Sequence, residues 1–357
     1  MYDQIREDVF YILIYGGVTV MALMACCYLL LRRGNAFAPD ITPPVRLRHW
    51  SVALLAILAM SHIWYLPIVF LTSSEDIKMV DLVGGLLDSM TLLPVAIIVF
   101  ITMLQDRRRP LWPVAVMIAP VVAGGVYGVV TLSYALLPVL YVYALMMCVG
   151  LFIYMIRALK QYGRWLRDNY ADLEHKEVWQ SFLVLAIILL TFGIYAFTGK
   201  GPVYQYAMQV ITAILICFLL WRVETLQQLS ENTSSTAAEM PAIPASIGPL
   251  LKKRCENGQL YLQNDLTLTQ LAHAIGTNRT YLGQYFAQQG ITYNAYINGL
   301  RVNHFVRLYH EAVADQRIFT AQQLAFQSGF HSYSTFSSTF KQNMGMTVTQ
   351  WMHSVAE

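Results

Sequence analysis

Residues 326–345 read FQSGFHSYSTFSSTFKQNMG, and this stretch decides the fold of the C-terminal part of the chain. Gly329 is followed by a short turn, and then by aromatic residues four apart, Phe336 and Phe340. Residues four apart lie on one face of a helix, so the two rings predict an amphipathic helix that begins just after the turn. A helix that ends at a glycine, a short turn and a second helix together make a helix-turn-helix.

The same pattern occurs earlier in the chain. Residues 267–286 read TLTQLAHAIGTNRTYLGQYF, and residues 320–340 read TAQQLAFQSGFHSYSTFSSTF. Both copies begin with Thr-x-x-Gln, a capping box in which the two side chains bond to backbone N–H groups at a helix start. Both place a glycine nine residues later, at Gly276 and Gly329, where a helix C-terminus favours glycine. The sequence therefore predicts two helix-turn-helix units, joined by one long helix over residues 297–313.

Two such units joined by a helix resemble the DNA-binding domain of the AraC/XylS family of transcription regulators. The resemblance covers residues 250–357, and the positions of the family pattern are filled by Gly329, Phe330, Phe336, Phe340, Lys341 and Gly345. It implies a transcription regulator that binds DNA. The layout of the whole chain also resembles the membrane-anchored branch of that family, which carries a multi-helix N-terminal domain.

In a helix-turn-helix, residues near the N-terminus of the second helix meet base edges in the major groove. With Asn278 as N-cap, Leu282 and Phe286 face inward and the other positions face outward. Lys341 and Arg301 are expected to meet phosphates. A solvated helix face is the alternative for each polar residue. The remaining predicted DNA contacts are Arg279, Thr280, Gly283 and Gln284 in the first unit, and Tyr333, Ser334, Thr335 and Ser338 in the second.

Apolar runs fill most of the chain before residue 222. The chain is 56% hydrophobic and 13% charged, whereas a soluble domain carries about 25% charged residues. A bilayer core needs about 20 mostly apolar residues, and seven runs meet this length: 9–31, 51–71, 82–105, 111–133, 134–156, 179–198 and 203–221. The predicted fold is all-α: a polytopic seven-helix transmembrane domain (1–222), a flexible linker (223–249) and a soluble double helix-turn-helix domain (250–357).

Lysine and arginine are unequally distributed between the loops. The loops after the first, third and fifth runs hold twelve of them, whereas the N-terminal segment and the other short loops hold Arg6, Lys78 and Lys200. Because positively charged loops stay in the cytoplasm, we predict an inner-membrane protein with its N-terminus outside and its C-terminal domain in the cytoplasm. Residues 170–180 read YADLEHKEVWQ and predict an interfacial helix; a contact with the DNA-binding domain is the alternative.

Polar side chains inside apolar runs are candidates for a sensing site. His62 and Asp88 are the only His, Asp, Glu, Lys or Arg residues in the seven runs, and a short loop joins the two runs that hold them. We expect a His62–Asp88 contact, with a purely structural interhelical hydrogen bond as the alternative. Tyr127, Gln205 and Gln209 complete a predicted pocket that is open to the outside. Tyr127 is flanked by glycines, which let helix backbones approach closely.

These observations predict a membrane-bound one-component transcription regulator. Its expected partners are promoter DNA and the lipid bilayer; RNA polymerase, a small-molecule ligand from outside and a second copy of the chain are further candidates. The five cysteines lack metal-ligand spacing, and no catalytic or nucleotide-binding motif occurs, so no enzyme activity, cofactor or metal is expected. Two alternatives stay open: a transporter or membrane enzyme with a regulatory tail, and a passive anchor on a constitutive DNA binder.

Overall fold

The computed structural model describes residues 8–32, 42–174, 176–180, 183, 187, 202–229 and 247–356. The chain divides into two compact units. The first unit is Met1–Tyr162 with His175–Leu229, and the second unit is Gly163–Glu174 with Ser230–Glu357. Within the described ranges the regular structure is helical, apart from one isolated β-bridge between Tyr170 and Thr267. The all-α prediction is therefore confirmed.

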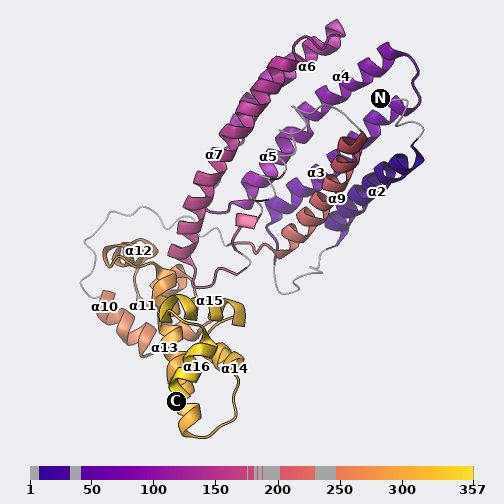
Figure 1. Ribbon diagram of the computed structural model, residues 1–357. Coiled ribbons are helices and arrows are strands. Elements are labelled where there is room, and N and C mark those ends of the chain that lie inside the picture. Colours follow the sequence, from indigo (N-terminus) through magenta and orange to yellow (C-terminus); the bar gives the residue numbers. More distant parts are fainter. Residues whose placement is uncertain are drawn as a thin grey trace. The chain divides into compact units, whose positions relative to one another are not determined.

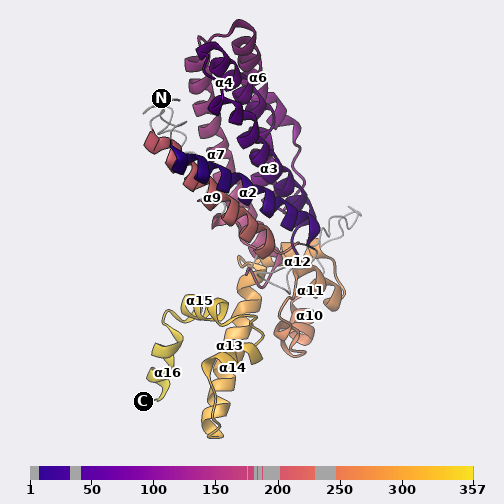
Figure 2. The ribbon, with the colours of Figure 1, turned by 90° about the vertical axis from the view of Figure 1, so that its right-hand side faces the viewer.

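Long apolar helices make up the first unit (Figures 1 and 2). Among the described residues, six helical segments are long and apolar enough to cross a membrane. Most of the predicted run 179–198 lies outside the described residues. The six segments are α2 (Val9–Leu31), α3 (Val45–Tyr65) with η1 (Leu66–Val69), α4 (Ser74–Met90) with α5 (Leu92–Met103), α6 (Trp112–Thr131), α7 (Leu137–Asn169), whose last residues belong to the second unit, and α9 (Pro202–Thr225).

The third apolar segment differs from its predicted run, 82–105, in two ways. It begins at Ser74, because the Ser73 hydroxyl accepts a hydrogen bond from the Asp76 N–H and so caps the helix. It is also interrupted after Met90. Pro94 lies four residues later and has no N–H to donate to the Met90 carbonyl, which ends the regular hydrogen-bonding pattern there.

The segment after the fifth apolar run differs more strongly from its prediction. Helix α7 continues to Asn169, beyond the predicted end at residue 156. Residues 170–174 and 176–178 are not helical. The prediction of an interfacial helix over residues 170–180 is therefore wrong for most of its length.

The residues after α9 are packed rather than free. Val223, Leu226 and Leu229 are buried, and the Gln105 side chain bonds to the chain beside them. Its amide nitrogen donates to the Gln227 carbonyl at 3.0 Å, and its oxygen accepts from the Leu229 N–H at 2.9 Å. Residues 223–229 thus belong to the first unit, and not to the linker that the sequence predicts from residue 223.

Two helix-turn-helix pairs and one long helix, α13 (Tyr293–Ala314), make up most of the second unit. Figure 2 shows α13 between the first pair and the C-terminal helices. The observed helices agree with the predicted repeat and with the long connecting helix. The other elements are α10 (Ile247–Leu250), η2 (Leu251–Glu256), η3 (Leu260–Leu262), α11 (Leu268–Ile275), α12 (Arg279–Gln288), α14 (Ala321–Gln327), α15 (Tyr333–Met344) and α16 (Val348–Ala356).

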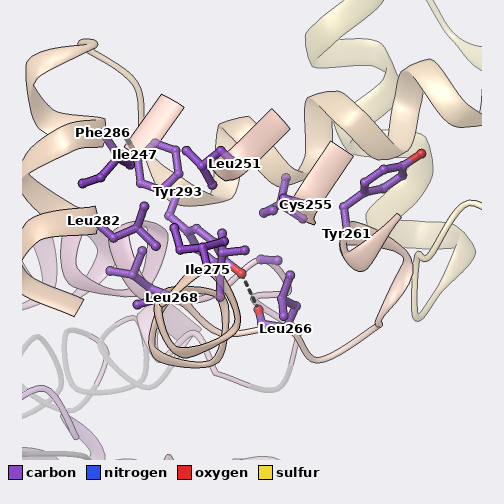
Figure 3. Close-up of a cluster of buried hydrophobic side chains, with 14 residues drawn as sticks. Ile247, Leu251, Cys255, Tyr261, Leu266, Leu268, Ile275, Leu282, Phe286 and Tyr293 are labelled. Atoms are coloured by element: carbon purple, nitrogen blue, oxygen red, sulfur yellow. Dashed lines mark hydrogen bonds between the residues drawn. The ribbon is translucent and has the colours of Figure 1, made fainter. Parts of the chain in front are cut away.

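Each pair has its own hydrophobic core. Figure 3 shows the first core, in which the hydroxyl of the buried Tyr293 donates to the Leu266 carbonyl at 2.9 Å. The second core is aromatic: ring centroids of Phe305 and Phe336 lie 4.4 Å apart, and those of Phe340 and Trp351 lie 5.5 Å apart. Phe336 and Phe340 face inward as predicted, and they hold α15 against α13.

Candidate nucleic-acid interface

The first helix of each pair starts with a capping box. In α11 the Thr267 hydroxyl accepts from the Gln270 N–H at 3.2 Å, and the Gln270 side chain accepts from the Thr267 N–H at 2.8 Å. Thr320 and Gln323 make the same two bonds at 3.1 and 3.0 Å in α14. Both predicted capping boxes are confirmed, so the two pairs begin with the same local geometry.

The second helix of the first pair, α12, begins where the sequence predicts. The Asn278 side chain accepts from the Tyr281 N–H at 2.9 Å and caps it, and Leu282 and Phe286 are buried in the core. The predicted DNA-contacting residues are therefore kept on the other faces. Thr280 is exposed, and Arg279, Gly283 and Gln284 are partly exposed.

Packing inside the second unit does not demand a glycine at position 283. A methyl group there would meet the Leu268 Cδ2 at 3.8 Å, which is an ordinary van der Waals distance. Close approach of DNA to the Gly283 backbone stays a prediction.

The second helix of the second pair, α15, is capped by Ser332, whose hydroxyl accepts from the Thr335 N–H at 3.3 Å. The Thr335 side chain is half-buried, whereas the other predicted contacts are open to solvent. Those exposed residues are Tyr333, Ser334, Ser338 and Lys341. Solvent-facing residues at the start of both α12 and α15 are the arrangement that a major-groove reader needs.

The predicted phosphate contact of Arg301 is wrong, because the structure buries this side chain. It is 1% exposed. Its guanidinium donates to the carbonyls of Tyr261, Gln263 and Asn264 at 2.8, 2.7 and 3.1 Å. It also lies 5.8 Å from the ring centroid of Phe330. Arg301 therefore ties the loop around η3 to α13, and burial lowers its pKa from the usual arginine value.

His304, one turn further along α13, is also turned toward the first pair. Its Nδ1 lies 2.7 Å from the Tyr261 hydroxyl and 3.1 Å from an Arg307 nitrogen. Burial, and then the neighbouring Arg307 charge, lower the pKa of His304 below the ordinary histidine value. The neutral imidazole is thus the form that fits this position.

The sequence carries a third capping signal, which is not part of the predicted repeat. The Thr347 hydroxyl accepts from the Gln350 N–H at 3.3 Å, and the Gln350 side chain accepts from the Thr347 N–H at 3.0 Å. This Thr-x-x-Gln starts α16, whose Trp351 closes the second core. The pattern alone could have located this helix.

Two of the predicted reading residues are bonded to Asn169 and Glu174, and Glu174 lies in the segment 170–180 for which a contact with the DNA-binding domain was the alternative prediction. Arg279 Nε donates to Asn169 Oδ1 at 2.9 Å, and the Thr335 hydroxyl donates to Glu174 Oε2 at 3.1 Å. Asn169 and Glu174 lie far from the helix-turn-helix region in sequence, and no motif marks them. Only the tertiary fold brings them to α12 and α15.

The polar residues predicted for a sensing site form two separate contacts in the first unit. His62 Nε2 lies 3.1 Å from Gln209 Oε1, and the Tyr65 hydroxyl donates to Asp88 at 3.1 Å. No hydrogen bond joins His62 to Asp88 among the described residues, and the expected contact between them stays a prediction. The Tyr15 hydroxyl also donates to the His62 carbonyl at 2.7 Å.

The two remaining predicted sensing residues have different surroundings. Gln205 Oε1 is buried and has no hydrogen-bond partner among the described residues. The Tyr127 side chain is 47% exposed. Tyr127 therefore lies open on α6, and an outward-facing pocket that includes all five residues stays a prediction.

Glycines allow the close helix packing that the sequence predicts around Tyr127. A methyl group on Gly124 would lie 2.6 Å from Leu140 Cδ2, and one on Gly128 would lie 3.3 Å from Leu82 Cδ2. Gly84 gives the same kind of room to the Tyr65 side chain that bonds to Asp88, since a methyl group on Gly84 would lie 2.6 Å from Tyr65 Cζ. These glycines let α6 approach its neighbours and let Tyr65 lie on α4.

The fold and the exposed faces of α12 and α15 define a helix-turn-helix DNA-binding domain. A family model described as a helix-turn-helix domain matches residues 271–354, and its AraC type supports the resemblance to the AraC/XylS transcription regulators. No curated protein sequence and no solved structure matches the chain.

Proposed function

We propose that this chain is a membrane-bound one-component transcription regulator, in which the apolar helices receive a signal and α12 and α15 read promoter DNA. The observation that carries the proposal is the pair of helix-turn-helix units on α13, together with six apolar segments of membrane-crossing length among the described residues. The matched helix-turn-helix model supports DNA binding and transcription regulation.

Side-chain chemistry supports different roles for the two helices in DNA recognition. Arginine pairs bidentately with guanine and glutamine with adenine, so Arg279 and Gln284 are the proposed base readers of α12. The hydroxyls of Ser334 and Ser338 contact either kind of base, and Lys341 takes a phosphate. Two such helices on one rigid connector would read successive major grooves on one side of the duplex.

The distribution of loop charges supports the proposed topology. The N-terminus lies outside, and the helix-turn-helix domain lies in the cytoplasm, where chromosomal DNA and RNA polymerase are accessible. The His62–Gln209 and Tyr65–Asp88 contacts are then in the outer halves of their helices, within reach of a small molecule from outside. We assign signal reception to this region, because buried polar contacts in apolar helices are candidates for function.

The test of DNA reading is genome-wide mapping of DNA bound by the full chain in its membrane. We expect discrete promoter sites, and loss of most of their occupancy in Arg279→Ala. The matched control is Arg307→Ala, which removes an arginine side chain that is 54% exposed on α13, outside the proposed surface. Equal occupancy in both variants would contradict the assignment of α12.

Signal reception is tested in the same cells with Asp88→Asn and His62→Gln. Loss of regulation with retained promoter occupancy supports a sensor. Unchanged regulation supports a passive anchor, and loss of uptake of a substrate supports a transporter.

A further inference from the structure

Residues 163–174 comprise the end of α7 and the five residues that follow it, yet they belong to the same compact unit as the helix-turn-helix pairs. We call these residues the strap. The residues that flank the strap are bonded within the first unit, where the Tyr162 hydroxyl donates to the Lys176 carbonyl at 3.0 Å and Arg222 of α9 donates to the Glu177 carbonyl. The base of the strap, Tyr162 with Lys176 and Glu177, thus belongs to the unit of the apolar helices.

The strap is an integral part of the second unit. Ala171 is 1% exposed and packs in the core of the first helix-turn-helix pair. Asn294 and Asn298 of α13 donate to the Ala171 carbonyl at 2.6 and 3.0 Å. An isolated antiparallel bridge pairs Tyr170 with Thr267, the N-cap of α11. These contacts hold the strap on the same side of α13 as the first pair.

The strap engages the starts of both proposed reading helices. Asn169 receives the Arg279 Nε at 2.9 Å, and its own amide nitrogen donates to the Trp165 carbonyl at 2.6 Å, which orients Oδ1 toward the arginine. Glu174 receives the Thr335 hydroxyl at 3.1 Å. Arg279 is the first residue of α12 and Thr335 the third of α15. These are the positions from which a helix-turn-helix meets bases.

The chemistry of these contacts disfavours DNA binding. Glu174 places a carboxylate at the N-terminus of α15, where the helix dipole and free N–H groups favour an anion such as a DNA phosphate. A phosphate brought to the same place would be repelled by this carboxylate. While its Nε is bonded to Asn169, Arg279 cannot offer that N–H to a phosphate or a base, and its guanidinium is held by the strap.

We propose that the strap is an autoinhibitory segment, which occupies the reading ends of α12 and α15 until the apolar helices withdraw it. This inference rests on the proposed DNA-binding function. It also supplies the coupling between signal and output: the base of the strap is bonded to α7 and α9, so a signal that moves these helices acts on the strap through the chain itself. DNA and the strap then compete for the same side chains.

The test uses the purified full chain in lipid nanodiscs and duplexes selected from a random-sequence library, separately with wild type and each variant. Affinities are then compared on one selected duplex. Glu174→Gln and Asn169→Ala each remove one strap contact, and we expect each to bind about tenfold more tightly, because a bond to a charged group is lost from the closed form only. Glu177→Gln is the matched control: it removes one negative charge three residues away, outside the strap, and is expected to bind like wild type.

Wild-type affinity in Glu174→Gln and Asn169→Ala would overturn the proposal, as would an equal gain in Glu177→Gln, because a gain of that kind reflects net charge alone. Failure of wild type and all variants to select any duplex would overturn the DNA-binding function itself, and the inference with it.

A reversible lock provides a second measurement. A short reducible cross-linker between Glu174→Cys and Thr335→Cys is expected to lower DNA affinity at least about tenfold, and reductant is expected to restore it to the value of the same double variant before cross-linking. Cross-linking that leaves affinity unchanged would overturn the proposal.

Discussion

The two helix-turn-helix pairs start from the same sequence signal and end in different surroundings. Both turn glycines have positive φ, 80° at Gly276 and 91° at Gly329. A methyl group on Gly276 would meet nothing within 4 Å, whereas one on Gly329 would lie 2.8 Å from Leu262 Cα and 2.9 Å from Leu262 O. The glycine of the first turn has open space beside it, whereas the glycine of the second turn is packed against η3. A local repeat thus determines helix and turn, but not what the turn contacts.

The reading helices differ as well. Helix α12 carries Arg279 and Gln284, whose long side chains pair bidentately with bases, whereas α15 carries serine and threonine. The strap also contacts the two pairs differently. Ala171 is buried in the core of the first pair, whereas the contact with α15 is the hydrogen bond between Glu174 and Thr335. The first pair is therefore expected to provide most of the sequence discrimination, and the second to position the domain.

The largest loss of stability is expected at Arg301, which joins the η3 loop to α13. Arg301→Leu leaves the carbonyls of Tyr261, Gln263 and Asn264 without their donor, and should destabilise the helix-turn-helix domain by about 3–5 kcal/mol. Urea-dependent proteolysis of the purified full chain measures this. Arg307→Leu, on the same helix, should change stability by less than about 0.5 kcal/mol. Equal losses of stability in the two variants would contradict the role of Arg301 in joining the η3 loop to α13.

The second test compares the two turns directly. Both Gly276→Ala and Gly329→Ala force a Cβ into a left-handed conformation, at a cost of about 1 kcal/mol. Only Gly329→Ala also clashes with backbone atoms of Leu262, so its total cost in stability should exceed about 2 kcal/mol. The same proteolysis assay compares them, and matching losses would show that the second turn moves away from η3 freely.

The third test concerns the reading helices. Gln284→Ala should reduce discrimination at one base pair by about 1–3 kcal/mol, and Ser338→Ala should reduce it by less than about 1 kcal/mol. Binding to a panel of single-base variants of a selected duplex measures both, with folding checked by proteolysis. A larger loss for Ser338→Ala would reverse the proposed division between α12 and α15.

The smallest expected effect is a loss of stability at low pH that is confined to the surroundings of His304, on one side of α13. Burial lowers the pKa of His304 in the folded chain, so the unfolded chain binds a proton that the folded chain does not, and stability falls as pH drops below about 6.5. We expect a small loss of stability, visible as faster amide exchange near Tyr261 and around His304 in α13. Exchange in α15 should change less, and His304→Gln should abolish the difference.

Much of the second unit could be predicted from local signals. The capping boxes at Thr267 and Thr320 and the aromatic spacing at Phe336 and Phe340 act over a few residues, so their geometry is already present in the sequence. The apolar runs were predictable for the same reason, since length and composition are local properties. The start of α4 was missed, because a serine cap before a polar turn carries no apolar signal.

The role of Arg301 and the individual bonds of Asn169 and Glu174 could not be predicted in this way, although a contact of residues 170–180 with the DNA-binding domain was the alternative prediction for that segment. An arginine beside a recognition surface fits a phosphate contact as well as a buried one, and only packing of the η3 loop against α13 places three carbonyls around it. Asn169 and Glu174 meet α12 and α15 across more than a hundred residues of sequence. By itself, then, the sequence determined two helix-turn-helix units and a set of membrane-length helices, because caps, periodicity and hydropathy are short-range. The tertiary structure alone decided which polar side chains are buried and which reading residues are covered, because burial depends on segments that chain folding brings together.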